Sequence, residues 1–63
     1  MNFSRNFQQA RKKIGLTQSE LADKLGVNQS AVANWESGIR EPKLSQLEDI
    51  AKVLKVKVEE LIR

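Results

Sequence analysis

Short amide and hydroxyl side chains follow one another at helical spacing between residues 28 and 37. Projected at about 100° per residue, one side of this segment carries only small neutral groups, which are Gln29, Ser30, Ala33, Asn34 and Ser37. A helix that is merely solvated more often carries lysine and glutamate on its outer face. Glutamine and asparagine can bond adenine in two places, and serine adapts to several partners. This side of the segment is therefore suited to the edges of DNA bases.

Catalytic chemistry has few candidate residues in this chain. It contains no histidine, cysteine or tyrosine, so the usual metal ligand, the usual general base and any disulfide are missing. Serine–lysine and carboxylate pairs exist, but no neighbouring group could activate them. A core of this size also leaves little volume for a substrate cleft. We expect no enzymatic activity, no metal and no cofactor.

Length and charge describe one small domain. Sixty-three residues have room for a single core, so residues 1–63 are predicted to form one domain. Eleven basic and eight acidic residues give a net charge of +3, which fits a polyanionic partner but decides little alone. The apolar runs are too short for a membrane span or a secretion signal. The expected location is the cytoplasm, at the nucleoid if the source is bacterial or phage.

Apolar residues recur at steps of three and four in two longer segments, which predicts amphipathic helices. The first stripe is Phe3, Phe7, Ala10 and Ile14, ended by Gly15; the second is Leu44, Leu47, Ala51 and Leu54, with Ile50 beside it. Either Asn2 or Ser4 could cap the first helix. The second could begin with a Ser45–Glu48 capping box or at Lys43, directly after Pro42. A final turn or two is predicted near residues 58–62, so the fold class is all-α.

Residues 17–38 contain two helix starts separated by a glycine. Thr17 and Glu20 form a capping box, and Gly26 suits the left-handed end of the helix that follows it. Asn28 is a good N-cap for the next helix. Val32 and Trp35 point toward the core, with Ile39 expected to continue that side. This arrangement specifies a sharp corner between two short helices, the helix-turn-helix unit.

The same residues resemble a known family. The pattern Thr17-Gln18-Ser19-Glu20-Leu21-Ala22, then Leu25-Gly26-Val27, then Trp35-Glu36-Ser37-Gly38, then Pro42 is similar to the Cro/C1-type helix-turn-helix domain. This is the lambda-repressor-like fold, also called the xenobiotic-response-element family. The resemblance runs from about Phe7 to Leu61. It implies a compact five-helix domain whose third helix lies in the major groove of double-stranded DNA.

The resemblance also assigns roles by position. It implies base contacts from Gln29, Ser30 and Asn34, with Asn28 and Ala33 alongside, and phosphate contacts from Gln18, Ser37, Gly38, Arg40 and Lys43. It further implies an ion pair between Arg11 and Glu36. That pair is expected mainly to hold two helices in one orientation, although Arg11 could also approach a phosphate.

The chain departs from the family pattern at three places. Lys55 stands where many relatives have glycine after the fourth helix, and a left-handed conformation is less favourable for lysine than for glycine. Lys43 and Lys57 stand where relatives often have a capping serine. Ser30 replaces a longer amide found in some relatives, so their target sequences cannot be transferred to this chain.

Together these features predict a sequence-specific transcriptional regulator, with repression as the expected mode. Two copies are expected on a roughly palindromic operator, with Val56, Val58, Leu61 and Ile62 as the homodimer surface; alternatively, these residues only seal the core. The chain would be a minimal regulator or the DNA-binding part of a longer protein. The rival hypothesis is a protein-interaction module of the same fold, such as an antitoxin or a regulator antagonist.

Overall fold

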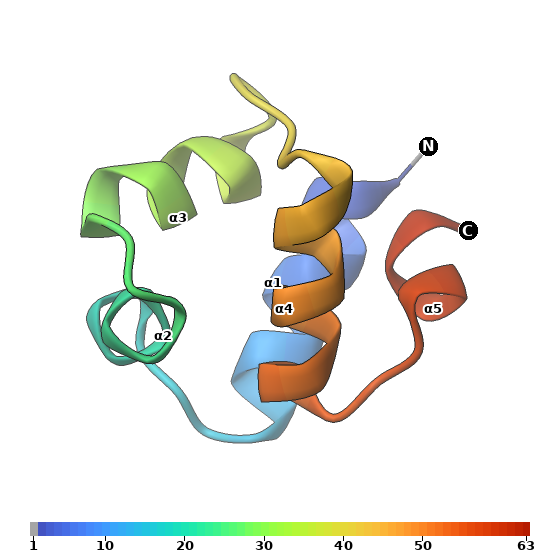
Figure 1. Cartoon of the computed structure of the whole chain (residues 1–63), viewed down its shortest axis with the longest axis horizontal. Helices are drawn as coiled ribbons and strands as arrows, with labels where there is room; N and C mark the ends of the chain where they lie inside the picture. Colours follow the sequence, from blue (N-terminus) through green and yellow to red (C-terminus); the bar gives the residue numbers. More distant parts are fainter. Residues whose placement is uncertain (1) are drawn as a thin grey trace.

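The computed structural model describes residues 2–63 and contains five helices, in agreement with the spacing of apolar residues in the sequence. Turns and loops join the helices, the longest being the α3–α4 loop of residues 38–43 (Figure 1), and this part of the chain contains no strand. The helices are α1 (Phe3–Lys13), α2 (Gln18–Leu25), α3 (Gln29–Ser37), α4 (Leu44–Leu54) and α5 (Val58–Ile62). The predicted all-α, five-helix architecture is confirmed.

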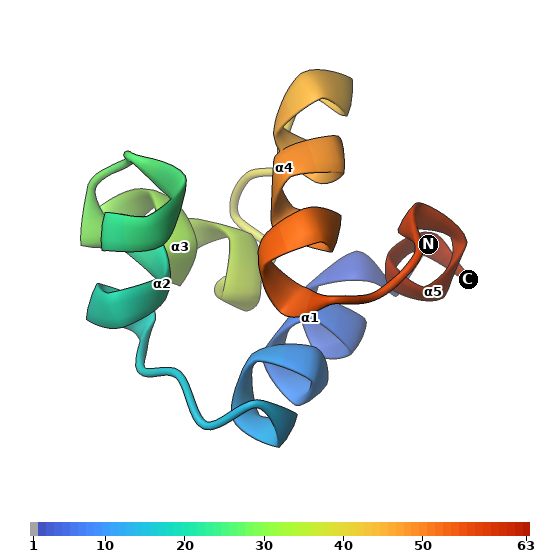
Figure 2. The same cartoon turned by 60° about the horizontal axis from the view of Figure 1, so that its bottom comes forward.

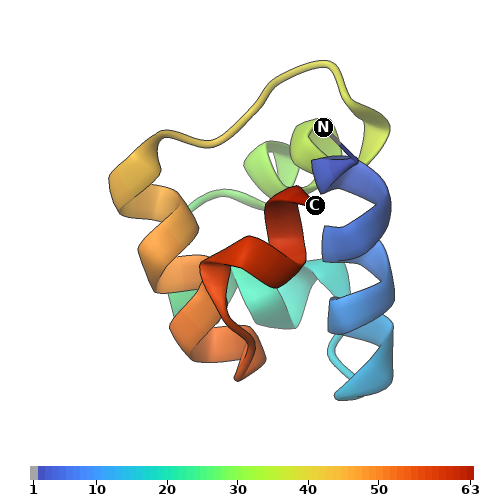
Figure 3. The ribbon, with the colours of Figure 1, turned by 90° about the vertical axis from the view of Figure 1, so that its right-hand side faces the viewer.

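The helices surround one core within a body of 25 × 23 × 20 Å. Helices α2 and α3 pack against each other on one side of the molecule, and α5 lies on the other side (Figures 1 and 2). Helix α1 contacts both α3 and α5. Figure 3 shows α5 crossing between α4 and α1. The helix-turn-helix is therefore held at one side by the remaining helices.

The core is formed by side chains that are at most 5% exposed. Its members are Phe3, Phe7, Leu21, Ala22, Val32, Trp35, Ile50, Ala51, Leu54 and Leu61. The ring centroids of Phe7 and Trp35 lie 6.0 Å apart, and those of Phe3 and Phe7 lie 5.2 Å apart, within the range of favourable aromatic pairs. Trp35 thus fixes α3 to α1 and leaves the opposite edge of α3 free.

Three predicted apolar positions are not in the core. Ile14 is 39% exposed as the C-cap residue of α1, one position past the last helical residue, Lys13. Ile39 is 73% exposed because Gly38, with φ 83°, redirects the chain out of α3. Leu44 is 70% exposed at the first position of α4, before the part of that helix that reaches the core. The helical spacing fails at each site because the residue lies at or beyond a helix end.

The start of α4 agrees with one of the two predicted alternatives. Lys43 is the N-cap residue, and its backbone N–H donates to the side-chain oxygen Oε1 of Gln46 at 2.8 Å. The Ser45–Glu48 box does not form the cap. Of the candidates for α1, Asn2 occupies the N-cap position, although its side chain makes no capping hydrogen bond.

Helix α5 is attached to α1 by a side chain from the opposite end of the sequence. The amide Nδ2 of Asn6 donates to the carbonyl oxygens of Leu61 and Arg63, at 3.1 and 3.0 Å. Glu59 and Glu60 lie in the first turn of α5, where the helix dipole favours negative charge. None of the helices described here is long and apolar enough to span a membrane.

Candidate nucleic-acid interface

The corner between α2 and α3 is formed by the capping box and the glycine that the sequence predicted. The hydroxyl Oγ1 of Thr17 accepts from the Glu20 N–H at 3.0 Å, and the Glu20 carboxylate accepts from the Thr17 N–H at 2.9 Å. Gly26 has φ 71°, and the Val27 N–H then donates to the Ala22 carbonyl at 3.0 Å. Because Val32 is fully buried, the direction of α3 is fixed by the turn that precedes it and by its inner face.

The outer edge of α3 presents polar groups that no neighbour uses. The side chains of Asn28, Gln29 and Ser30 are exposed, and those of Ala33 and Asn34 are half-buried. Asn28 occupies the N-cap position, as predicted, but its side chain makes no capping bond. Across the described chain, the Asn28, Gln29, Ser30 and Asn34 side chains make no hydrogen bond to another protein group. Their donors and acceptors are therefore available to a ligand.

The segment after α3 turns back on the last turn of that helix. Ser37 is the final residue of α3, and its hydroxyl donates to the Asn34 carbonyl at 3.1 Å. The Arg40 N–H donates to the same carbonyl at 3.3 Å. Arg40 and Lys43 are exposed, and neither forms an ion pair within residues 2–63. The cationic side chains in the segment between α3 and α4 thus have no anionic partner within the described residues.

The predicted pair between Arg11 and Glu36 is confirmed, and it is part of a larger network. Nε of Arg11 donates to one carboxylate oxygen of Glu36, and Nη2 donates to the other at 3.1 Å. Nη1 of Arg11 donates to the Leu16 carbonyl at 2.7 Å. The side chains of Arg11 and Glu36 are only 11% and 4% exposed. This burial favours the structural role over a phosphate contact by Arg11.

Gln18 has a partner that the sequence did not reveal. Its amide Nε2 donates to Oε1 of Glu36 at 3.2 Å, which links the start of α2 to α3. Burial by itself raises the pKa of the Glu36 carboxyl, but hydrogen bonds from Arg11 and Gln18 and the Arg11 charge outweigh it. The pKa of Glu36 therefore lies below its ordinary value of 4.5. Three helices thus meet at one ionised carboxylate.

Acid is expected to destabilise the fold through Glu36. Because its pKa is lowered by folding, its stabilising contribution is complete above the unfolded value of 4.5 and is lost as the pH falls through the folded value. Thermal unfolding measured from about pH 7 to about pH 2 should show Tm falling below pH 4.5. In Glu36→Gln, which cannot titrate there, the decline should be shallower. Parallel profiles for the two proteins would assign the acid sensitivity to other groups.

The four residues predicted as a dimer surface differ in their exposure. Ile62 is 38% exposed, whereas Val56 and Val58 are half-buried against the core. Leu61 is 1% exposed, so its side chain seals the core and offers no area to a second copy. Leu61 therefore agrees with the alternative prediction, in which these residues only seal the core.

Comparison with known proteins agrees with this geometry. The chain is 39% identical over 62 residues to the HTH-type transcriptional activator BcrR of Enterococcus faecalis, covering 98% of this chain and 30% of BcrR. It spans about half the length of two further regulators that it matches. The structure matches the biofilm regulator SinR in complex with DNA, with a TM-score of 0.90 and 34% identity, covering 97% and 98% of the two chains.

An enzyme also contains this fold. Hydroxypropylphosphonic acid epoxidase from S. wedmorenis matches with a TM-score of 0.89 and 33% identity, over 95% of this chain but only 32% of the epoxidase. The shared part is thus a minor portion of that protein. The helix-turn-helix family HTH_3 matches residues 7–61, the same range as the Cro/C1-type resemblance. The chain belongs to this helix-turn-helix family.

Proposed function

We propose that this chain binds double-stranded DNA in a sequence-specific manner and regulates transcription, with α3 in the major groove. The observation that carries the proposal is the outer edge of α3. Its amide and hydroxyl groups have no partner within the described chain, while the opposite face is anchored by Val32 and Trp35. A rigid helix with free, short, neutral donors and acceptors suits direct reading of base edges.

The roles on DNA divide between reading and positioning. Asn28, Gln29, Ser30, Ala33 and Asn34 are proposed to face the bases, and Gln18, Ser37, Gly38, Arg40 and Lys43 are proposed to contact phosphates. Gln18 already donates to Glu36, so only its remaining amide atoms are free for a phosphate. Phosphate contacts fix the register of the protein without reading sequence.

Two copies on a roughly palindromic operator are proposed because one copy is small. A single module of this kind buries about 600–1,000 Å² of protein surface on DNA, so a second copy would add much of the specificity. The exposed side chain of Ile62, together with Val56 and Val58, is the proposed contact. SinR, solved with DNA, supports the docking of this fold on a duplex.

Repression is the proposed mode because a domain seated in the major groove excludes other proteins from its operator. BcrR, a relative, is described as an activator, so the sign of regulation depends on where the operator lies relative to the promoter. Action on DNA would place the protein in the cytoplasm, at the nucleoid of a bacterial host.

Two measurements test the proposal. Selection of bound duplexes from a random pool should return one enriched sequence with approximate two-fold symmetry. In titrations of that duplex, the logarithm of the binding constant should fall linearly with the logarithm of the salt concentration. The slope should be near −3.6 if Arg40 and Lys43 of two copies each release a counterion. Absence of duplex binding at low salt would refute the proposal and favour a protein-interaction role for the fold.

A further inference from the structure

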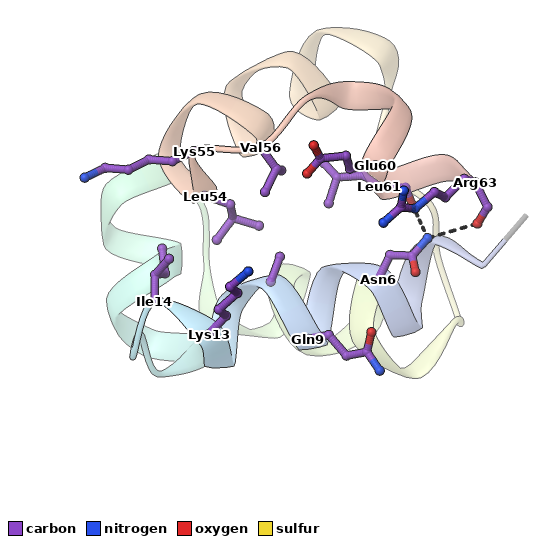
Figure 4. A pocket seen from close by; sticks show the side chains of 11 residues that line it. Asn6, Gln9, Lys13, Ile14, Leu54, Lys55, Val56, Glu60, Leu61 and Arg63 are labelled. Carbon is purple, nitrogen blue, oxygen red and sulfur yellow. Dashed lines mark hydrogen bonds between the residues drawn. The ribbon is translucent and has the colours of Figure 1, made fainter.

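A groove lies on the side of the molecule away from the α3–α4 loop. It consists of two adjoining hollows, of about 420 and 480 Å³, that share Ile14 and Lys55 in their linings. Figure 4 shows the first hollow between α1 and the α4–α5 connection. In Figure 1 the ends of α1 and α4 that border it lie at the bottom of the molecule, with the α3–α4 loop at the top. No residue between 28 and 43 lines either hollow.

The lining of this groove, which we name the Lys55 groove, combines an apolar floor with a cationic rim. Its apolar members are Ala10, Ile14, Leu16, Val53, Leu54, Val56 and Leu61, of which Leu54 and Leu61 are almost fully buried beneath the others. The charged members are four cations, Lys13, Lys24, Lys55 and Arg63, and a single anion, Glu60. None of the four cations forms an ion pair within residues 2–63. The rim therefore carries more positive than negative charge above an apolar surface, even with Glu60 on the rim and Glu20 acting on Lys24.

Lys55 stands in a backbone conformation that disfavours a side chain. Its φ is 60°, and it is the only residue other than glycine with a positive φ in the described chain. The other left-handed positions are Gly15, Gly26 and Gly38. Glycine would relieve the strain at residue 55, so the turn between α4 and α5 does not require lysine. The one residue other than glycine in a left-handed conformation thus lines both hollows.

We propose that the Lys55 groove binds an acidic amphipathic helix of a partner protein while α3 remains free for DNA. Apolar side chains spaced three and four residues apart on such a helix would contact the floor, as in other helix-in-groove complexes. Glutamates or aspartates flanking that stripe would meet the four cations of the rim. The apolar floor argues against DNA as the occupant, because a phosphate backbone offers nothing to cover Ile14 or Leu16. This surface is additional to the proposed DNA interface, and it shares Val56 with the proposed contact between two copies.

The proposal is tested with a synthetic helical peptide that has leucines along one face and glutamates on both sides of that face. Its twin keeps the leucines and replaces every glutamate by lysine. Fluorescence anisotropy should show the acidic peptide binding at least about tenfold more tightly than its twin, with an affinity that decreases with salt. Addition of the selected duplex should leave the peptide bound.

Lys55→Gly separates a binding role from a structural one. This variant should weaken the acidic peptide about tenfold while Tm rises, because the strained conformation suits glycine. Lys13→Ala should also weaken the peptide, whereas Lys12→Ala should not. Lys12 is exposed next to Lys13 on α1 but lines neither hollow, so it controls for the loss of one charge. Ile14→Ser tests the apolar floor. It should weaken peptide binding at low salt, and it should also weaken the binding that remains at high salt, where charge contacts are screened.

Several results would overturn the proposal. Equal affinity for the two peptides would remove the charge complementarity on which it rests. Unchanged peptide binding in Lys55→Gly, or equal losses in Lys12→Ala and Lys13→Ala, would exclude the groove as the site. Displacement of the peptide by duplex DNA would overturn simultaneous binding, whether the peptide lies on the α3 face or two copies pair through Val56. A change in sedimentation of Lys55→Gly alone, showing that a second copy normally fills the groove, would replace the partner helix by self-association.

Discussion

Replacement of Glu36 by alanine is expected to lower the free energy of unfolding by about 3–5 kcal/mol, because it leaves the Arg11 guanidinium buried without its charged partner. Both side chains are almost entirely covered, so water cannot take over the lost hydrogen bonds. A domain of this length has a total stability of only about 3–9 kcal/mol at typical values per residue. Urea titration followed by circular dichroism should therefore find Glu36→Ala largely unfolded or close to its transition without denaturant.

A double variant distinguishes the ion pair from simple loss of volume. Arg11→Met combined with Glu36→Leu removes both charges and keeps apolar bulk, so it should recover much of the stability lost in Glu36→Ala. Gln18 would then lose its acceptor on Glu36, but a half-buried amide can still reach water. A loss of less than about 1 kcal/mol in Glu36→Ala, the size seen for surface pairs, would contradict a buried network.

The second large effect is expected on DNA. Asn34→Ala should weaken binding to the selected operator by about 1–3 kcal/mol for each copy bound, and should hardly change binding to random duplex. The side chain of Asn34 makes no internal hydrogen bond. The backbone carbonyl of residue 34 accepts from the Ser37 hydroxyl and the Arg40 N–H, and alanine retains this carbonyl. The loss would therefore report base contacts and not a disturbed loop. Competition between labelled operator and random duplex measures both affinities.

Arg40→Ala is the matched control for that measurement. Because a phosphate contact carries no sequence information, this variant should weaken operator and random duplex alike and reduce the salt slope by about one for each copy. The two variants alter neighbouring parts of the same surface, so their contrast isolates reading from positioning. If both variants lost affinity equally on the two duplexes, the division of roles proposed here would be wrong.

The fold could be predicted because its signals are local. The Thr17–Glu20 box and Gly26 each act within one helical turn, and each appears in the structure as the sequence indicated. The inward direction of Val32 and Trp35 follows from helical spacing alone, and both are buried. The Arg11–Glu36 pair joins residues that are 25 positions apart, and only the family resemblance suggested it.

What could not be predicted depends on contacts between distant elements or on helix ends. Ile39 and Leu44 are apolar at helical spacing, yet they are exposed, because Ile39 lies past the end of α3 and Leu44 is the first residue of α4. The Gln18 amide could turn toward solvent or toward Glu36, and only the packing of α2 on α3 selects the second. Asn28 has the type and position of a capping residue, but its side chain makes no capping hydrogen bond. The exposed edge of the site is therefore richer in free amides than its sequence implied.

The Asn6 contact has a consequence for how the protein folds. Its hydrogen bonds to Leu61 and Arg63 bridge 55 and 57 positions in sequence, and α5, with five residues, is too short to be stable as an isolated helix. These hydrogen bonds join segments that are far apart in the sequence, so forming them costs loop-closure entropy. The contact order is thereby raised above that of a bundle with only neighbouring contacts, which slows folding. In native-state hydrogen exchange, α5 and the start of α1 should open together as one foldon before the helix-turn-helix does.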